Sequence, residues 1–237
     1  MKKIIILGAT SGIGKELAQL YAKENHTVAI TGRRTHLLDE LKIENPNFII
    51  KTFDIVQTDE TIKVLDDLSQ ELGGVDLLII SSGTGDVNHD LDFALEKRTI
   101  ETNVIGFTCV CNWAVNYFEK QGHGHLVGIT SVAGIRGSRY APAYNASKSY
   151  QINYFEGMKQ KLVSYKKTIF ITDIRPGFVD TDMAKGEGLF WVAPLEKAGK
   201  QIYKAIEKKK KIAYITKRWR IIAIILRLIP NWIYNKI

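Results

Sequence analysis

The sequence contains little of what metal sites, disulfide frameworks and secretory segments require. Only two of its 237 residues are cysteine, Cys109 and Cys111, and a single residue separates them. This spacing suits neither a metal site nor a disulfide framework, so we expect a reducing compartment and no bound metal. The apolar run near the start covers only Ile4 to Leu7. Because that is too short for a secretory segment, we interpret it as a buried strand and expect a cytoplasmic protein.

Acidic residues are nearly absent from the C-terminal stretch. Residues 197–237 hold 12 Lys/Arg and one acid, Glu207, for a net charge of +11, whereas residues 1–196 hold 21 basic and 24 acidic residues, for a net charge of −3. No basic stripe with interleaved aromatic residues runs through the acidic part. We therefore do not expect a nucleic-acid partner.

Short apolar runs alternate along the chain with longer segments in which apolar residues recur every three or four positions. The apolar runs are 3–8, 26–31, 47–53, 75–81, 125–130 and 168–174, and the helical segments include 12–25, 56–72 and 144–165. Continuous apolarity is typical of strands buried on both faces of a parallel sheet. Repeated strand–helix units predict an α/β fold, a doubly wound parallel sheet flanked by helices. With neither a repeat nor a long linker, we expect one domain over 1–216, followed by an amphipathic extension over 217–237.

A glycine-rich loop, GATSGIGK, directly follows the first predicted strand and opens the first predicted helix. Its glycines would let the backbone turn tightly and approach a pyrophosphate, to which the helix N-terminus would offer free N–H groups. The spacing differs from G-x-G-x-x-G, and a plain strand-to-helix turn is the alternative. Its place in the first strand–turn–helix unit favours nucleotide binding. The predicted cofactor-binding residues of this loop are Gly8, Thr10, Ser11, Gly12, Ile13 and Gly14.

The second predicted strand ends in TGRR, where dinucleotide folds that prefer NAD carry an acid that binds the ribose. Gly32 stands where the acid would be, and Arg33 and Arg34 follow it. Two cations at a helix N-terminus gain nothing from the helix dipole, whereas the 2′-phosphate of NADP would explain them. We therefore expect NADP(H) to be preferred over NAD(H), with Arg33 the better candidate for the phosphate. Asp54, after the third strand, is placed either to touch the adenine or to cap a helix.

Tyr144 and Lys148, in YNASK, are four residues apart and therefore share one face of a predicted helix. Chance alone would produce about one such pair in a chain of this composition, so the pair carries weight only with its neighbours. Ser131 lies just past the strand 125–130, and Asn103 lies in the preceding helical region. Open α/β sheets build ligand sites at the carboxyl ends of their strands. The four residues therefore form a candidate catalytic site.

Together these motifs resemble the short-chain dehydrogenases/reductases, from residue 3 to about residue 215 and in the family's order. The motifs are the glycine loop, Asp54, Asn103, Ser131, Tyr144 with Lys148, and RPGFVDT at 175–181. The resemblance implies a Rossmann fold and hydride transfer between a nicotinamide and a carbonyl or alcohol. The further cofactor contacts that it implies are Gly83, Asn103, Tyr144, Lys148, Pro176, Gly177, Val179 and Thr181.

The resemblance also implies a role for each catalytic residue. Tyr144 would exchange a proton with the substrate oxygen, while Lys148 would bring the pKa of that phenol down from about 10 and hold the nicotinamide ribose. Ser131 would donate a hydrogen bond to the substrate oxygen, and Asn103 would hold a water that relays protons to Lys148. The segment 80–83, ISSG, departs from the family's usual Asn-Asn-Ala-Gly. We expect this departure to affect the rigidity of the sheet more than the chemistry.

Two segments bear on substrate and membrane contact. Residues 182–194, a mobile lid in the family, include an apolar cluster at 189–192 that favours a hydrophobic or lipid-like substrate, or else packs on the domain. The tail, 217–237, lacks the ~20 uncharged apolar residues that a spanning helix needs. On a helix ending near Pro230, its cations share one face and its apolar residues fill a wide opposite arc, with Ile224 on the polar side. We expect the tail either to lie on an anionic membrane surface or to pack on the protein.

The resemblance further implies a homodimer or homotetramer, formed through helices at about 105–120 and 144–164. Two alternatives to an enzyme stay open on the same scaffold: a catalytically silent NADP-binding regulator, and a lipid-surface interaction protein. The presence of all four catalytic positions disfavours the first, and the second rests on the tail alone.

Overall fold

Seven parallel strands form one sheet in the computed structural model, which describes residues 1–165, 167–184 and 189–236. The strands are β1 (Lys3–Leu7), β2 (Thr27–Gly32), β3 (Ile49–Thr52), β4 (Leu77–Ile80), β5 (His123–Ile129), β6 (Thr168–Pro176) and β7 (Ile212–Ile215). They lie in the order β3-β2-β1-β4-β5-β6-β7, so the chain runs outwards from β1 in one direction and then in the other. The predicted doubly wound fold is therefore confirmed.

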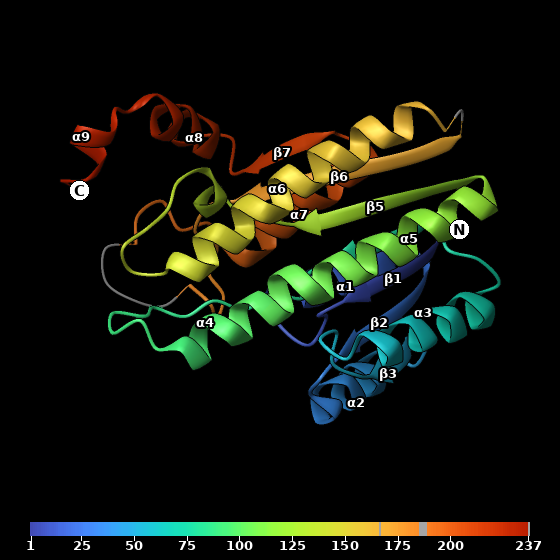
Figure 1. Ribbon diagram of the computed structural model, residues 1–237. Coiled ribbons are helices and arrows are strands. Elements are labelled where there is room, and N and C mark those ends of the chain that lie inside the picture. Colours follow the sequence, from blue (N-terminus) through green and yellow to red (C-terminus); the bar gives the residue numbers. More distant parts are fainter. Residues whose placement is uncertain (166, 185–188, 237) are drawn as a thin grey trace.

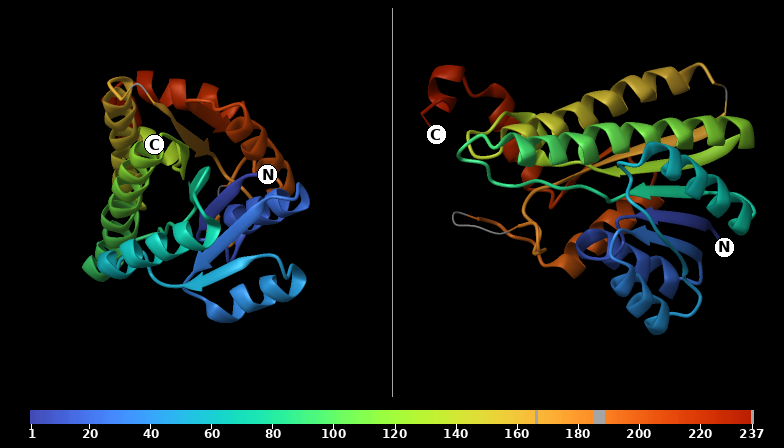
Figure 2. Two further views of the ribbon diagram at one scale, coloured as in Figure 1. Left: turned by 90° about the vertical axis from the view of Figure 1, so that its right-hand side faces the viewer. Right: turned by 60° about the horizontal axis from the view of Figure 1, so that its bottom comes forward.

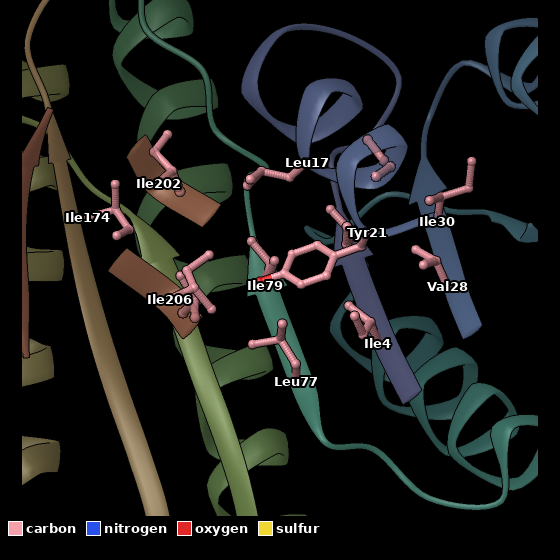
Figure 3. Packing of buried hydrophobic residues seen from close by; sticks show 14 of the residues in the cluster. Ile4, Leu17, Tyr21, Val28, Ile30, Leu77, Ile79, Ile174, Ile202 and Ile206 are labelled. Carbon is pink, nitrogen blue, oxygen red and sulfur yellow. The ribbon is translucent and has the colours of Figure 1, made fainter. Parts of the chain in front are cut away.

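Helices cover both faces of the sheet (Figure 2), which explains why the strands are continuously apolar. In β1, Ile4 and Ile6 point into one core while Ile5 and Leu7 point into the other, because side chains alternate along a strand. The first core, shown in Figure 3, lies under α1 (Gly12–Lys23), α2 (Thr35–Glu44) and α7 (Leu195–Glu207). The second lies under α3 (Thr58–Leu72), α5 (Phe107–Gln121) and α6 (Pro142–Val163).

The carboxyl ends of the strands share one end of the molecule, where the C-terminal segment also lies (Figure 1). The N-terminus lies at the other end. Two short helical segments also lie at the carboxyl end. A π-helix at Glu101–Gly106 follows α4 (Phe93–Ile100), and a 3-10 helix at Val132–Ile135 follows β5. The chain finishes there with α8 (Trp219–Leu228) and α9 (Asn231–Tyr234).

The strand β7 is absent from the six strands that the sequence predicted. It pairs with β6 at the edge of the sheet and leaves Ile212 exposed. The predicted boundary after residue 216 falls between β7 and α8, and it stays a prediction. Across the residues that the structure describes, no helix has the length and apolarity to cross a bilayer.

Candidate active site

The glycine loop joins β1 to α1 so tightly that side chains cannot be added at its ends. Gly8 has a φ of +78°, and a Cβ there would lie 2.6 Å from the backbone nitrogen of Ser82. A Cβ on Gly14 would lie 2.2 Å from the Gly8 carbonyl oxygen, so the first turn of α1 packs directly on the strand end. Gly12, with a φ of +54°, brings the loop against Thr181. The backbone and the helix N-terminus are thus bare where a pyrophosphate would bind.

The two arginines after β2 differ in their surroundings. The Arg34 guanidinium donates to Thr10 Oγ1 (2.7 Å) and Ser11 Oγ (2.7 Å), and thereby ties α2 to the glycine loop. The Arg33 side chain is 57% exposed and lies 3.4 Å from Asp54 Oδ2. Gly32 is packed against the Thr10 methyl group, 2.6 Å from where a Cβ would be, so an acid there would require Thr10 to move. Of the two arginines, Arg33 therefore has the guanidinium that a ligand could reach.

Asp54 both turns the chain and pairs with that cation. Its Oδ1 accepts from the backbone N–H of Val56 (3.2 Å), and its backbone carbonyl accepts from Gln57 N–H at the start of α3. Its other oxygen faces Arg33. Asp54 thus caps the turn before α3. Its contact with the adenine stays a prediction.

Tyr144, Lys148 and Ser131 come together at the carboxyl end of β5. Burial raises the pKa of Tyr144, and a hydrogen bond with Ser131 opposes that shift. Ser131 is held by the backbone N–H of Ala133, which donates to its Oγ (3.0 Å). Lys148 Nζ lies 5.7 Å from the centre of the Tyr144 ring and donates to the Ile129 carbonyl (3.0 Å). Burial lowers the pKa of Lys148 to about 8, although the charge of Asp173 acts in the other direction.

Asn103 fixes the segment that follows β4. It is fully buried in the π-helix, and its side chain makes both backbone hydrogen bonds of Thr84, accepting from N–H (2.9 Å) and donating to C=O (2.7 Å). It also donates to Ser147 Oγ (3.0 Å). The hydrogen bonds between Asn103 and Thr84 hold the backbone close to residues 80–83, where ISSG departs from the family's usual sequence. The π-helical turn is typical of functional sites, because it redirects one carbonyl out of the helical ladder.

Two functional neighbours were missed by the sequence reasoning. The first is Gln151, 1% exposed, whose Oε1 accepts from Lys148 Nζ (3.1 Å) and whose Nε2 donates to the Asn103 carbonyl (2.9 Å). Its carboxamide joins the same two groups that the predicted water would join. The second is Gly85, where a Cβ would lie 2.2 Å from the Tyr144 ring. Spacing along α6 could have flagged Gln151, one turn beyond Lys148, but nothing in the sequence points to Gly85.

The residues that were predicted to contact the nicotinamide lie near Ser131, Lys148 and the glycine loop. Gly83 faces the catalytic centre, since a Cβ there would lie 3.5 Å from Lys148 Nζ. Pro176 ends β6 and its carbonyl lies 3.5 Å from Ser131 Oγ. Thr181 Oγ1 donates to the Val179 carbonyl (3.2 Å), which turns its methyl group towards the glycine loop. The predicted residues are thus brought to one end of the sheet.

Gly177 lies under the indole of Trp219, the first residue of α8. A Cβ on Gly177 would lie 1.9 Å from that ring, so the two are in direct contact. The ring centre of Trp219 lies 5.3 Å from that of Phe178 and 5.2 Å from that of Phe190. Trp191 joins the same aromatic cluster at 6.3 Å. The C-terminal segment therefore helps to build the wall of the site.

The lid predicted at 182–194 is described only in part, because residues 185–188 lie outside the described residues. Its second half returns to the domain through a bridge between Val179 and Ala193. Phe190 and Trp191 are about half exposed while contacting Trp219. The apolar cluster thus packs on the protein with one side and keeps the other side open.

Known proteins resemble this chain in sequence and in architecture. A family model described as short chain dehydrogenase matches residues 2–189. An uncharacterized oxidoreductase of Mycobacterium tuberculosis is 31% identical over 218 residues, which cover 88% of this chain and 85% of that protein. The chain belongs to the short-chain dehydrogenase family. A more distant relative of this short-chain dehydrogenase is 11-beta-hydroxysteroid dehydrogenase 1A of Arabidopsis thaliana, which is 28% identical over 194 residues, 78% of this chain and 54% of that protein.

Solved structures show the same fold at lower sequence identity. A short-chain dehydrogenase from Streptomyces avermitilis superimposes with a TM-score of 0.83 at 21% identity, covering 96% of this short-chain dehydrogenase and 92% of that chain. ElxO with NADP bound superimposes with a TM-score of 0.79 at 20% identity, covering 91% and 97%. Family membership makes the chain an oxidoreductase by class.

Proposed function

We propose that this short-chain dehydrogenase transfers hydride between NADP(H) and a hydrophobic carbonyl or alcohol. The observation that carries the proposal is the convergence of Tyr144, Lys148 and Ser131 at the end of β5, at the same end of the sheet as the glycine loop. A side chain that could exchange a proton with a substrate oxygen and a loop that suits a dinucleotide phosphate thus lie at one end of the sheet.

The chain's own residues fit a dinucleotide with a 2′-phosphate. The bare backbone at Gly8 and Gly12 and the N-terminus of α1 suit a pyrophosphate. Arg33 offers an exposed guanidinium at the point where Gly32 excludes an acid, which suits the extra phosphate. The NADP found in ElxO, a protein of the same fold, agrees with this assignment. When bound, this cofactor would supply or accept the hydride.

Tyr144 is proposed as the proton donor in the reductive direction and the acceptor in the oxidative one. Burial disfavours its charged form, so in the absence of other charges the phenol stays protonated. A Lys148 ammonium 5.7 Å from the ring centre would favour the phenolate, and would thereby act against the rise that burial causes in the pKa of Tyr144. Ser131 Oγ, fixed by the Ala133 N–H, donates to the substrate oxygen and stabilises the charge that develops there.

A hydrophobic substrate is proposed because aromatic rings flank this centre. Phe178, Phe190, Trp191 and Trp219 form a continuous cluster beside Gly177, with Phe190 and Trp191 half exposed. An apolar wall of this kind favours a ligand that buries hydrocarbon, as ligand pockets generally do. A long-chain aldehyde or ketone would place its carbonyl at Ser131 and Tyr144 and its chain along these rings.

The proposal is tested by following NADPH absorbance with the purified protein and a panel of aldehydes and ketones of increasing chain length. We expect consumption that depends on the carbonyl compound and whose kcat/KM rises with chain length. Tight NADPH binding without turnover of any member would favour the catalytically silent regulator instead. Binding of neither cofactor nor substrate would leave the lipid-surface protein as the better account.

A homodimer or homotetramer is proposed through the outer faces of α5 and α6. These helices border a shallow surface hollow around Gly157, which is exposed and whose added Cβ would meet nothing within 4 Å. A small residue at that position lets a second copy of the helices approach across a two-fold axis.

We expect the wild-type chain to behave as a dimer or tetramer in light scattering at micromolar concentration. Gly157→Arg should shift it to the monomer while the chain stays folded, since an added Cβ at this position meets nothing within 4 Å in a single chain. Glu40→Arg, on the exposed side of α2, should leave the assembly unchanged. A monomeric wild-type protein would contradict the proposal.

A further inference from the structure

Helix α8 carries two apolar stripes, of which the body of the protein covers only one. The inward stripe consists of Trp219, Ile222, Ala223 and Leu226, which pack with Val132, Ile135 and Phe178. The outward stripe consists of Ile221, Ile224, Ile225 and Leu228, which are 60%, 49%, 51% and 76% exposed. The outward residues follow the i, i+3, i+4, i+7 spacing of a helix face that is normally buried. Ile224, expected on the polar side, belongs to this stripe.

Specific contacts hold α8 in this orientation. Arg136 donates to the carbonyls of Leu226 (3.2 Å) and Ile229 (3.0 Å), which satisfies the C-terminal end of the helix. The same guanidinium reaches Asn231 Oδ1 (2.9 Å) and stacks on the Tyr234 ring at 4.2 Å. Turning the outward stripe towards the protein would break these bonds and remove Trp219 from Gly177. The outward stripe is thus presented by a fixed helix.

The outward stripe belongs to a tail that is rich in cations. The described part of the tail, 217–236, contains five Lys/Arg and no Asp or Glu. Those five are all exposed, namely Lys217, Arg218, Arg220, Arg227 and Lys236. Trp232, 68% exposed, extends the apolar surface beyond Pro230. A fixed apolar stripe with flanking cations and a tryptophan is the composition of a helix that lies in the headgroup region of a bilayer.

We propose that the outward stripe of α8 docks the protein on an anionic lipid surface, with its isoleucines and Leu228 in the acyl boundary and its cations at the headgroups. Pairing of this stripe with a second copy is disfavoured, because it would bring two cationic surfaces together without an acid between them. The docked helix would hold the aromatic cluster, through Trp219, next to the lipid. Docking itself does not depend on the proposed hydride transfer.

The test is co-sedimentation of the full chain with phosphatidylcholine vesicles, with and without phosphatidylserine. The wild-type protein should sediment with the anionic vesicles and release at high salt, because surface charges are then screened. The triple variant Ile221→Ser, Ile225→Ser, Leu228→Ser should stay in the supernatant. The pair Arg220→Gln, Arg227→Gln should bind about 25-fold more weakly, at roughly fivefold per cation. A truncated tail is unsuitable, since it would also remove Trp219.

A matched control carries serine at Ile43, Ile62 and Val163, which are equally exposed but scattered over other elements. It should sediment like the wild type, and the melting temperatures of all variants should agree within a few degrees. Wild-type protein that stays in the supernatant with anionic vesicles would overturn the proposal. So would a stripe variant that still sediments, or one whose main effect in light scattering is to dissociate an oligomer.

A second inference rests on Gln151 and on the proposed function. Its carboxamide has one possible orientation, because the Asn103 carbonyl needs a donor and the Lys148 ammonium needs an acceptor. We infer that Gln151 is a positioning residue that holds the Lys148 ammonium against the Tyr144 ring. The only other acceptor of Lys148 in the described ranges is the Ile129 carbonyl. The ionisable groups that act on this ammonium are Tyr144 on the same helix and Asp173 on β6.

The direct readout is the pKa of Lys148, measured by an NMR titration of protein that carries ¹³C-labelled lysine. The Cε signal of Lys148 is assigned as the one that is missing from the variant Lys148→Met. Gln151→Leu removes an acceptor from the charged form and should lower the pKa of Lys148 by about one unit. Gln151→Glu adds a carboxylate and should raise that pKa. The basic limb of the kcat/KM profile for reduction should move in the same directions. Unchanged titration in both variants would overturn the inference, whereas expected titration without any turnover would count against the proposed function alone.

Discussion

Replacing Tyr144 by Phe is expected to lower kcat by about 10²- to 10⁴-fold while leaving the affinity for NADPH unchanged. The variant keeps the ring that packs against Gly85 and loses only the hydroxyl that exchanges the proton. Stopped-flow or steady-state kinetics gives kcat, and quenching of protein fluorescence gives the NADPH dissociation constant. A loss in kcat without a change in cofactor affinity indicates that an interaction of the reacting centre was removed.

The matched control is Tyr150→Phe, two turns along the same helix. Its hydroxyl forms a hydrogen bond with the Thr108 side chain (2.8 Å) and lies outside the proposed reacting centre. We expect near wild-type turnover from this variant. Retained turnover in Tyr144→Phe would mean that another group exchanges the proton.

Replacing Arg33 by Ala is expected to weaken NADPH binding by roughly 10- to 100-fold and to leave NADH binding unchanged. The guanidinium is the exposed cation next to Gly32, and its loss also leaves the Asp54 carboxylate unpaired near the phosphate. Fluorescence titration of both cofactors against both proteins measures the four dissociation constants. Because NADH lacks the 2′-phosphate, it serves as the internal control.

Lys51→Ala provides a second control, since Lys51 is an exposed cation on the neighbouring strand β3 that pairs with Glu71. It should affect neither cofactor. Equal dissociation constants of NADPH and NADH in the wild-type protein would contradict the assignment of the cofactor.

The sequence allowed the sheet and the catalytic centre to be predicted because both depend on local patterns. Strands such as β1 are apolar along most of their length, and Tyr144 and Lys148 lie one helical turn apart on α6. Ser131 lies just past the end of the strand β5. The parallel arrangement then brings strand ends together without further information. The features that could be predicted are thus those that depend on the spacing of residues along the chain and on the order of the strands.

The features that were missed depend on contacts between segments far apart in the sequence. The strand β7 has only four residues beside four lysines, and it is a strand because β6 offers it an edge. The division of α8 into two stripes follows from the contact of Trp219 with Gly177, which no helical periodicity predicts. Gln151 reads as an ordinary polar helix residue until Lys148 and the Asn103 carbonyl are seen on either side of it.

The most direct test of hydride transfer uses NADPH dideuterated at C4 of the nicotinamide and a long-chain aldehyde, with mass spectrometry of the alcohol. The proposed function predicts one deuterium per alcohol molecule, bound to the carbinol carbon, from the wild-type protein and almost no alcohol from Tyr144→Phe. Alcohol without deuterium, or no alcohol from the wild-type protein with any member of the carbonyl panel, would contradict it.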